Sequence, residues 1–352
     1  MNASAYGRRV ASKFISAMVV SLRKRPKIYA FARRHLRNSL IHRASRHLMA
    51  NEGGGAGHWD MHVALVESKS LKGWLDWDFI EEEHIRPQVS GDRTLYYLQY
   101  FFRNHLTSMP VKRALSVGCG GGNLERALIQ LNAAEKIDAF DASPESIRLA
   151  RELAGNAGIG SHQIRYEVEN INEIRLEPGA YDFVIAKMSL HHFENLEHVY
   201  DEIRRSLKPG GVFMFNEFVG PSRFQWTDLQ LELANELLRA LPERHRWSAH
   251  SGTQLSEIGR PTVAEMIEMD PTEAVRSADI MPVLDSFFEI VERKDYGGTL
   301  LHLLLTHVMA SFDLNDERQA SLLRTIFLFE RTLIAHKVLP SDFTYVVARP
   351  RS

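Results

Sequence analysis

Two histidines and a glutamate have side chains suited to proton transfer. His191 and His192 stand side by side in SLHHF, directly after the apolar run YDFVIAKM, and Glu217 lies near the end of a second apolar run, GVFMFNEF. A positioned imidazole or carboxylate can remove the proton of a hydroxyl group during a transfer reaction. We therefore predict His191, His192 and Glu217 as catalytic candidates, while a purely structural role for the paired histidines stays open.

A further polar group follows in the stretch NEFVGPSRFQWTD. It contains Arg223, Gln225 and Trp226. An aromatic ring beside charged and hydrogen-bonding groups suits a sugar or another polyol, because the C–H face of the sugar stacks while its hydroxyls form hydrogen bonds. We predict these three residues to bind substrate; the alternative is that Trp226 is partly core and that Arg223 pairs with an acid.

A glycine-rich turn indicates ligand binding of another kind. In ALSVGCGGGNLERAL a strand-like run ends in GCGGG, residues 118–122, and a helix is predicted to follow at once. Residues without a Cβ let the backbone bend sharply and approach a ligand closely. The spacing Gly118-x-Gly120-x-Gly122 departs from the dinucleotide fingerprint, whose third glycine is replaced by Asn123, and no Gly-Lys-Ser/Thr phosphate loop follows.

The elements that would position these residues alternate between strand and helix. Predicted strands are RALSVG, KIDAFD, IRYEVEN, YDFVIAKM and GVFMFNEF, followed later by FEIVERKDYGG and DFTYVVAR. Predicted helices span Asp92–His105, Leu124–Leu131, Pro144–Ala154 and Asn195–Leu207. This alternation predicts an α/β fold with a doubly wound, mostly parallel, seven-stranded sheet. Ligands of such sheets bind at the carboxyl ends of the strands.

The end of the second strand carries an acid at a useful place. Asp141 stands 23 residues after Gly118, where its carboxylate can accept hydrogen bonds from both hydroxyls of an adenosine ribose. Ser143 is predicted to cap the next helix, and Pro144 suits the first helical turn. At the end of the third strand, Asn170 or Glu169 could bond to the adenine edge.

Taken together, GCGGG, Asp141, SLHHF and the LKPGG turn before the fifth strand resemble the class I S-adenosylmethionine-dependent methyltransferases. The resemblance covers roughly residues 110–220 and implies a Rossmann-like methyltransferase fold with S-adenosyl-L-methionine as cofactor. One departure is Ser116, where the family usually carries Asp or Glu. The residues that the resemblance implies for cofactor binding are Gly118, Cys119, Gly120, Gly122, Asp141, Ala142, Asn170, Ile171 and Lys187.

The resemblance implies an enzyme, and we expect O-methylation of a small-molecule or glycan-like hydroxyl. A lipid, quinone or polyketide acceptor and a non-catalytic S-adenosylmethionine-binding adaptor remain open alternatives. EFVGPSRFQWTD and DPTEAVRSADI resemble a bacterial branch of methyltransferase-domain proteins associated with surface-glycan synthesis. No metal site is predicted, because the sequence around the histidines is not rich in carboxylates and shows no spacing typical of metal ligands.

Charge is distributed unevenly along the 352 residues. The first 51 residues contain twelve Lys/Arg and no Asp/Glu, which leaves 31 basic and 44 acidic residues in the rest. We predict a basic helical extension over 1–52, a linker and cap helices over 53–109, and a methyltransferase domain over 110–352 with helical insertions near 222–285 and 299–337. The acidic body disfavours nucleic acid as a partner.

The predicted location is cytoplasmic, because the single cysteine, Cys119, permits no internal disulfide and the longest apolar run of the basic extension, FISAMVVSL, is too short to cross a bilayer. Residues 1–50 could contact an anionic membrane surface peripherally, or pack on the acidic body or on a second subunit of a homo-oligomer.

Overall fold

The computed structural model describes residues 72–351. The predicted basic extension and the proposed membrane contact of residues 1–50 lie outside this part of the chain. Its main element is a seven-stranded sheet in the order β3-β2-β1-β4-β5-β9-β8. The strands are β1 (Val111–Val117), β2 (Ala134–Asp141), β3 (Ile164–Val168), β4 (Tyr181–Lys187), β5 (Leu207–Phe218), β8 (Phe288–Gly297) and β9 (Phe343–Pro350).

Strand direction confirms the predicted sheet. β1 pairs in parallel with β2 and β4, β2 with β3, and β4 with β5, while β9 runs antiparallel to both β5 and β8. The order reverses between β1 and β4, which places a topological switch point at the carboxyl ends of these two strands. The first glycine of GCGGG directly follows β1, and the two histidines lie shortly after β4.

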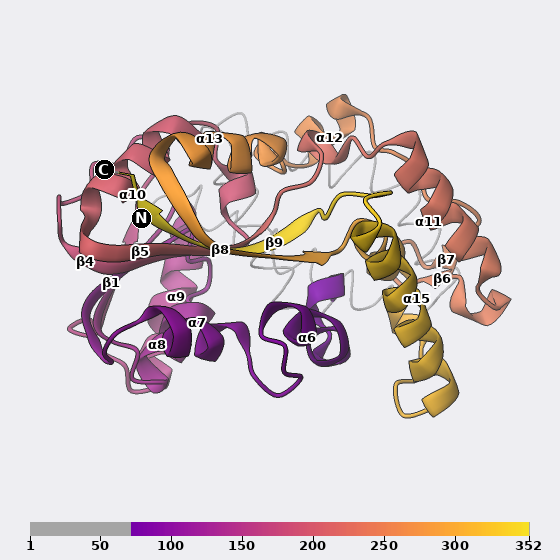
Figure 1. Ribbon diagram of the computed structural model, residues 1–352, viewed down its shortest axis with the longest axis horizontal. Helices are drawn as coiled ribbons and strands as arrows, with labels where there is room; N and C mark the ends of the chain where they lie inside the picture. Colours follow the sequence, from indigo (N-terminus) through magenta and orange to yellow (C-terminus); the bar gives the residue numbers. More distant parts are fainter. Residues whose placement is uncertain (1–71, 352) are drawn as a thin grey trace, which may run out of the picture. The chain divides into compact units, whose positions relative to one another are not determined.

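Helices cover both faces of the sheet, as Figure 1 shows, with α10 and α13 on one side and α7 and α8 on the other. The helices are α5 (Asp78–Ile80), α6 (Arg86–Val89), α7 (Tyr97–His105), α8 (Asn123–Gln130), α9 (Pro144–Asn156), α10 (Leu196–Ser206), α11 (Asp228–Ala240), α12 (Val263–Met269), α13 (Ile280–Phe287), α14 (Leu301–Val308) and α15 (Glu317–Ala335).

Shorter elements join them. These are the 3₁₀ turns η2 (Trp74–Asp76), η4 (Leu190–His192), η5 (Ser222–Phe224), η6 (Glu243–His245), η7 (Ser277–Asp279) and η8 (Met309–Ser311), the π-helical turn η3 (Glu81–Ile85), and a small hairpin of β6 (Trp247–Ser248) and β7 (Thr253–Gln254).

Alternate residues of each central strand bury their side chains in two separate apolar clusters. Ala114 and Ile185 belong to the cluster beneath α7, α8 and α9, whereas the neighbouring Leu115 and Val184 belong to the cluster under α10 and α13. The central strands therefore read as continuous apolar runs, since both faces of the sheet are covered.

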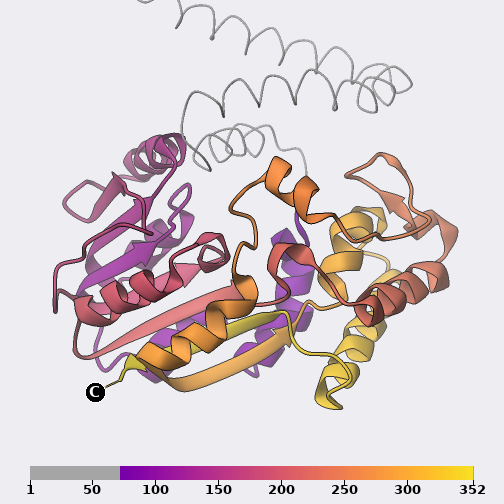
Figure 2. The same ribbon diagram turned by 90° about the horizontal axis from the view of Figure 1, so that it is seen from above.

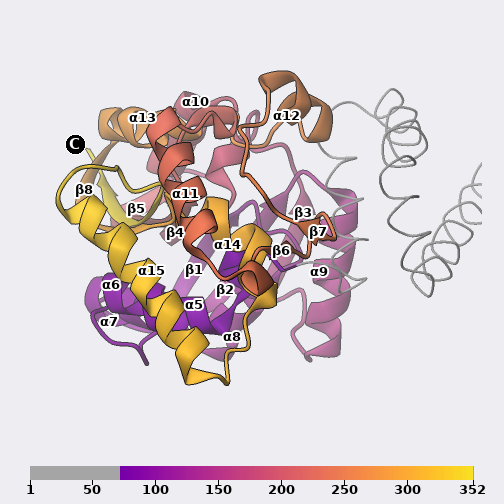
Figure 3. The same ribbon diagram turned by 90° about the vertical axis from the view of Figure 1, so that its right-hand side faces the viewer.

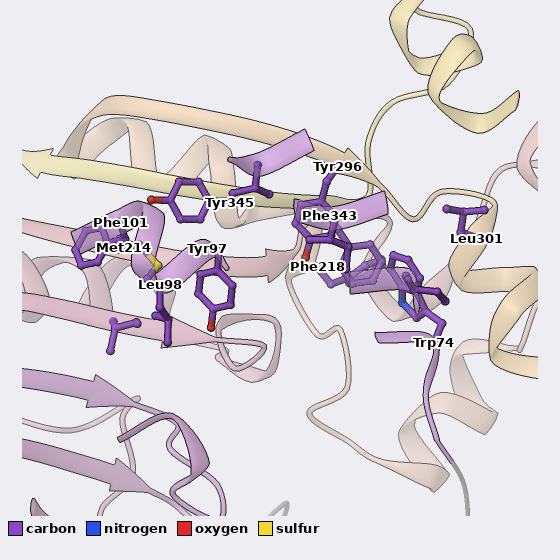
Figure 4. Close-up of a cluster of buried hydrophobic side chains, with 14 of the residues drawn as sticks. Trp74, Tyr97, Leu98, Phe101, Met214, Phe218, Tyr296, Leu301, Phe343 and Tyr345 are labelled. Carbon is purple, nitrogen blue, oxygen red and sulfur yellow. The ribbon is translucent and has the colours of Figure 1, made fainter. Parts of the chain in front are cut away.

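The segment before β1 forms part of the first cluster. The predicted helix over 92–105 begins only at Tyr97, because residues 92–95 form a turn in which the amide of Thr94 donates to Oδ1 of Asp92 (2.8 Å). Figure 4 shows side chains of α7 beside Tyr345 of β9, and Trp74 beside Phe343. The Trp74 and Phe343 rings meet edge to face at 5.0 Å. This contact anchors the start of the described chain to the sheet.

Two helical segments interrupt the last three strands of the sheet along the chain. Helices α11 to α13 and the β6–β7 hairpin lie between β5 and β8, and α14 and α15 lie between β8 and β9. Figure 2 shows α11, α14 and α15 at the end of the sheet away from the marked C terminus, and Figure 3 shows α11 and α15 from that side. Within residues 72–351, no helix combines the length and apolar character needed to cross a membrane.

Candidate active site

The glycine turn begins where β1 ends, and its three alternate glycines all have left-handed backbones. Gly118, Gly120 and Gly122 have φ values of 70°, 51° and 74°. A Cβ on Gly118 would lie 2.4 Å from the Cβ of Ser189, and one on Gly122 would lie 2.5 Å from the hydroxyl of Tyr166. Of these three glycines, only Gly120 has no atom of the described residues within 4 Å of an added Cβ. Packing within the protein thus requires Gly118 and Gly122, and the space beside Gly120 is open.

Asp141 at the end of β2 is fixed against this turn. Its Oδ2 accepts a hydrogen bond from the amide of Gly120 (2.8 Å), and its Oδ1 accepts one from the amide of Ser143 (2.9 Å). Ser143 caps α9 as predicted, because its hydroxyl accepts from the amide of Ser146 at 3.0 Å. The carboxylate therefore stands beside Gly120 at the switch point, which fits a ligand with hydroxyl donors.

An acid that the sequence analysis missed lies below the turn. Glu125, in the first turn of α8, is fully buried, and its Oε1 accepts a 2.5 Å hydrogen bond from the hydroxyl of Ser116. Burial raises the pKa of Glu125 to about 7, although the Ser116 hydroxyl and Arg126 act in the opposite direction. Its Oε2 has no hydrogen-bond partner among the described residues. The acid expected at position 116 is thus supplied from a helix instead.

The other predicted cofactor residues surround the same edge of the sheet. Asn170 is exposed after β3, where its amide donates to Oε1 of Glu173 at 3.0 Å. Ile171 is buried, Ala142 is exposed, and Lys187 ends β4 with its ammonium 6.0 Å from the Tyr97 ring centroid. Cys119 is buried, and burial raises the pKa of its thiol well above the ordinary value.

Glu217 organises the loop after β4. It is fully buried, and its Oε1 accepts hydrogen bonds from the amides of Ser189 and Leu190. Its Oε2 accepts a hydrogen bond from the backbone amide of Phe218 (2.9 Å) and lies 2.6 Å from Nδ1 of His191. Four groups therefore surround this carboxylate, so its contacts are those of a positioning residue for the histidine loop.

The two histidines face a carboxylate from the first insertion. Nε2 of His191 lies 3.7 Å from Oε1 of Glu273, and Nε2 of His192 lies 3.9 Å from Oε2 of the same residue. Burial lowers the pKa of His191, but Glu217 and Glu273 outweigh it and raise the pKa to about 9. For the Glu273 carboxyl, in contrast, burial raises the pKa above its ordinary value. We call His191, His192 and Glu273 the histidine–glutamate cluster.

Arg223 binds the segment that carries Glu273, and Gln225 binds the backbone of Arg223 and Pro261. Nη1 of Arg223 donates to the backbone carbonyls of Asp270 (3.4 Å) and Glu273 (3.1 Å). Nε2 of Gln225 donates to the carbonyls of Arg223 and Pro261, both at 2.9 Å. Their polar groups thus bond to backbone atoms, and the predicted substrate-binding role of these two residues stays a prediction.

Trp226 lies in an aromatic cluster next to the histidine loop. Its ring stacks on Phe224 at 5.2 Å with an interplanar angle of 4°, and His302 meets both rings edge to face. Phe218 connects this cluster to the histidines, with its ring centroid 6.3 Å from that of His191. The indole Nε1 of Trp226 is buried and has no hydrogen-bond partner among residues 72–351.

Comparison with known proteins agrees with the topology. The methyltransferase domain family matches residues 115–215. A ubiquinone biosynthesis O-methyltransferase of Xanthomonas euvesicatoria is 29% identical over 161 residues, which are 42% of this chain and 64% of that protein. The same enzyme of Xanthomonas campestris pv. campestris is 31% identical over 110 residues, or 31% of this chain and 44% of the relative. This chain thus spans less than two thirds of either relative.

More distant similarities name other acceptors. The sterol 24-C-methyltransferase ERG6B of Gibberella zeae is 26% identical over 141 residues, 40% of this chain and 37% of that protein. Among solved structures, a phosphoethanolamine N-methyltransferase 2 of Haemonchus contortus with S-adenosylhomocysteine has a TM-score of 0.43 at 15% identity, covering 71% of this chain and 52% of the other. Values this low support no inference about the substrate.

Proposed function

Residues 115–215 form a class I S-adenosylmethionine-dependent methyltransferase domain, and from this premise we propose that the protein methylates a hydroxyl group of a small molecule. The observation that carries the proposal is the position of the histidine–glutamate cluster. Ser189 begins the histidine loop, and its hydroxyl donates to the carbonyl of Val117 (2.8 Å), one residue before the glycine turn. Proton-transfer groups are thereby tied to the cofactor side of the site.

The residues present fit the cofactor. Gly120 is open where a ligand must approach the backbone, Asp141 stands beside it to accept ribose hydroxyls, and Glu125 offers a buried oxygen with no hydrogen-bond partner among the described residues. Asn170 and Ile171 would border the adenine. When bound, S-adenosylmethionine supplies a methyl group on a positively charged sulfur.

The chain must then orient the acceptor and remove its proton. Oxygen acceptors need this help more than amines do, and the histidine–glutamate cluster provides imidazole and carboxylate groups for it. Glu217 keeps the ring of His191 in place through Nδ1, and Arg223 keeps the Glu273 segment in place. His191 and His192 are therefore the proposed catalytic residues, with His192 as the base. His191 is protonated near neutral pH because its pKa is raised to about 9, so it would donate a hydrogen bond to the acceptor, and Glu217 acts through His191.

The neighbouring aromatic cluster supports a ring-shaped acceptor. Phe218, Phe224 and Trp226 can pack on the face of a phenol, a quinol or a sugar. The names of two relatives, both O-methyltransferases of ubiquinone biosynthesis, favour a phenolic or quinol hydroxyl over a glycan hydroxyl. A glycan-like acceptor remains the second candidate, because the indole N–H of Trp226, which has no hydrogen-bond partner among residues 72–351, suits a polyol.

Untargeted mass spectrometry of a deletion strain tests the proposal. A metabolite should lose a 14-dalton increment, and the purified protein should restore it with S-adenosylmethionine labelled in the methyl group. Label on an oxygen of a phenol or quinol supports the first candidate, and label on a sugar oxygen supports the second. Binding of S-adenosylmethionine without any transfer to a cell extract would instead support a non-catalytic adaptor.

A further inference from the structure

The histidine–glutamate cluster has the composition of a metal site. One donor atom from each of His191, His192 and Glu273 can be chosen so that all three lie within 4.8 Å of one another. We propose that these three side chains bind one divalent transition-metal ion, with Zn²⁺ as the best match. The sequence predicts no metal, because the carboxylate comes from an insertion far along the chain that only the fold brings to the histidines.

The outward nitrogens of both imidazoles are already held by oxygen atoms. Nδ1 of His191 lies 2.6 Å from the Glu217 carboxylate, which only accepts hydrogen bonds when ionised. Nδ1 of His192 lies 3.2 Å from the hydroxyl of Thr272, and that hydroxyl donates to Oδ1 of Asp270 at 2.8 Å. Each Nδ1 is therefore the donor, which leaves both Nε2 atoms as the ligating atoms.

This outer layer is typical of bound metals. Metal-ligating histidines almost always donate their second ring N–H to a carboxylate or another oxygen, which fixes the ring and its tautomer. Here one ring has a carboxylate, and the other has a hydroxyl backed by a carboxylate. Nε2 of His191 and Nε2 of His192 each lie within 4 Å of an oxygen of Glu273.

Distances and ligand types favour Zn²⁺. With bonds of about 2.0–2.1 Å in a tetrahedron, donor atoms lie about 3.3–3.5 Å apart. Nε2 of His191 lies 3.7 Å from Oε1 of Glu273 and Nε2 of His192 lies 3.9 Å from Oε2, while the three donors lie within 4.8 Å of one another. Side-chain shifts of up to about 1.5 Å would therefore complete a tetrahedral site. Two histidines and one glutamate leave a fourth position open, as in catalytic zinc sites. Mg²⁺ and Ca²⁺ prefer all-oxygen ligand sets.

The surrounding charges also call for a cation. Carboxylates of Glu217, Asp270 and Glu273 gather around two imidazoles, and the charges of His191 and Arg223 act on Glu273. A metal ion would displace the proton that the raised pKa of His191 implies near neutral pH, and with both imidazoles neutral, three ionised carboxylates and one guanidinium have a formal charge of −2. A divalent ion would neutralise that charge in a largely buried place, where unpaired charges are costly.

The metal inference goes beyond the proposed function, because binding of the ion requires no acceptor. Its catalytic use rests on that function: a hydroxyl bound at the open position would become more acidic, as metal-bound water does. In the metal-bound protein the two imidazoles would therefore act as ligands, and the ion would take over their part in removing the proton. Metal binding is therefore measured without substrate, so that its failure and the failure of O-methylation are separate results.

The experiment titrates Co²⁺ into the full-length protein after treatment with a chelator. Wild-type protein should bind one equivalent with the visible absorption of four-coordinate Co²⁺, and Zn²⁺ should displace it. Glu273→Gln, which keeps the side-chain size and changes a partly exposed group, should abolish this absorption. Thr272→Val, which removes only the outer oxygen, should weaken binding about 10–100-fold. His198→Gln is the matched control, since His198 bonds to the carbonyl of Ile174 outside the cluster.

Several results would overturn the assignment. They are the absence of stoichiometric Co²⁺ or Zn²⁺ binding by wild-type protein, equal binding by Glu273→Gln, and displacement of Co²⁺ by millimolar Mg²⁺, which would indicate a carboxylate site of another kind. Histidines elsewhere in the chain bind equally in every variant, so the difference between variants is the measurement. Circular dichroism of each variant confirms that the fold is retained.

Discussion

Alanine at Gly118 and alanine at Gly120 should destabilise the fold to different extents, although only one residue separates the two glycines. Both have left-handed backbones, which cost a residue with a Cβ about 1–2 kcal/mol. Only at Gly118 would the new Cβ also overlap Ser189, at 2.4 Å, and such overpacking costs about 1–3 kcal/mol more. Gly118→Ala should thus lose about 2–5 kcal/mol of unfolding free energy, and Gly120→Ala only about 1–2 kcal/mol.

Cofactor affinity should follow another order. Gly120→Ala places a methyl group in open space beside Asp141, where we propose that S-adenosylmethionine lies, so its affinity should fall at least about tenfold in a folded protein. Urea denaturation measures the first quantity, and isothermal titration calorimetry measures the second. If Gly120→Ala binds S-adenosylmethionine as tightly as wild type, or if Gly118→Ala is as stable as wild type, the interpretation of this turn is wrong.

Four further predictions concern buried acids and the histidine loop. The pKa of Glu125 is raised from 4.5 to about 7. The unfolding free energy should therefore fall by about 3 kcal/mol as the pH rises from about 4.5 through 7. Glu125→Gln should remove this pH dependence, and urea denaturation midpoints at pH 5 and pH 8 measure it. Burial and Glu330 raise the pKa of Asp342 to about 7, so Asp342→Asn should flatten the same part of the curve, and an unchanged slope in both variants would contradict the assignment. Glu217→Gln places an amide N–H₂ group against two N–H donors that the carboxylate now accepts from. The unfolding free energy should fall by about 2–6 kcal/mol, because each unsatisfied donor costs about 1–3 kcal/mol. A loss below about 1 kcal/mol in urea denaturation would contradict the positioning role of Glu217. Finally, His192→Gln should lower methyl transfer about 10²–10⁴-fold with cofactor affinity retained, and near-normal turnover would remove His192 from catalysis.

The sheet could be predicted from the sequence because its signals are local. Apolar runs such as YDFVIAKM and the cap formed by Ser143 mark element ends within a few residues. Asp141 and the glycine turn lie at the ends of adjacent parallel strands, so the topology alone brings them together. The apolar pattern of residues 92–105 predicts a helix that begins at Asp92, but α7 begins at Tyr97 because Asp92 and Thr94 form a turn.

The acceptor side depends on contacts that no local pattern shows. Glu273 reaches the histidines only because the amide of Val275 donates to the carbonyl of His191 (3.0 Å) and because Arg223 binds the same segment. Glu125 takes the place of an acid at position 116 by reaching from the following helix to Ser116. Both acids are ordinary in the sequence, since each stands in a helical or loop segment without a motif of its own.

Calorimetric titration of S-adenosylmethionine into wild-type protein and Asp141→Ala tests the central claim most directly. We expect wild-type protein to bind S-adenosylmethionine saturably at one site. Asp141→Ala should bind it at least about tenfold more weakly, because each charge-assisted hydrogen bond is worth about 1.5–3 kcal/mol. Glu152→Ala, at an exposed ion pair of α9 with Arg148, should bind like wild type. If wild-type protein does not bind S-adenosylmethionine, or if folded Asp141→Ala binds it with equal affinity, the proposed cofactor site beside Asp141 is wrong.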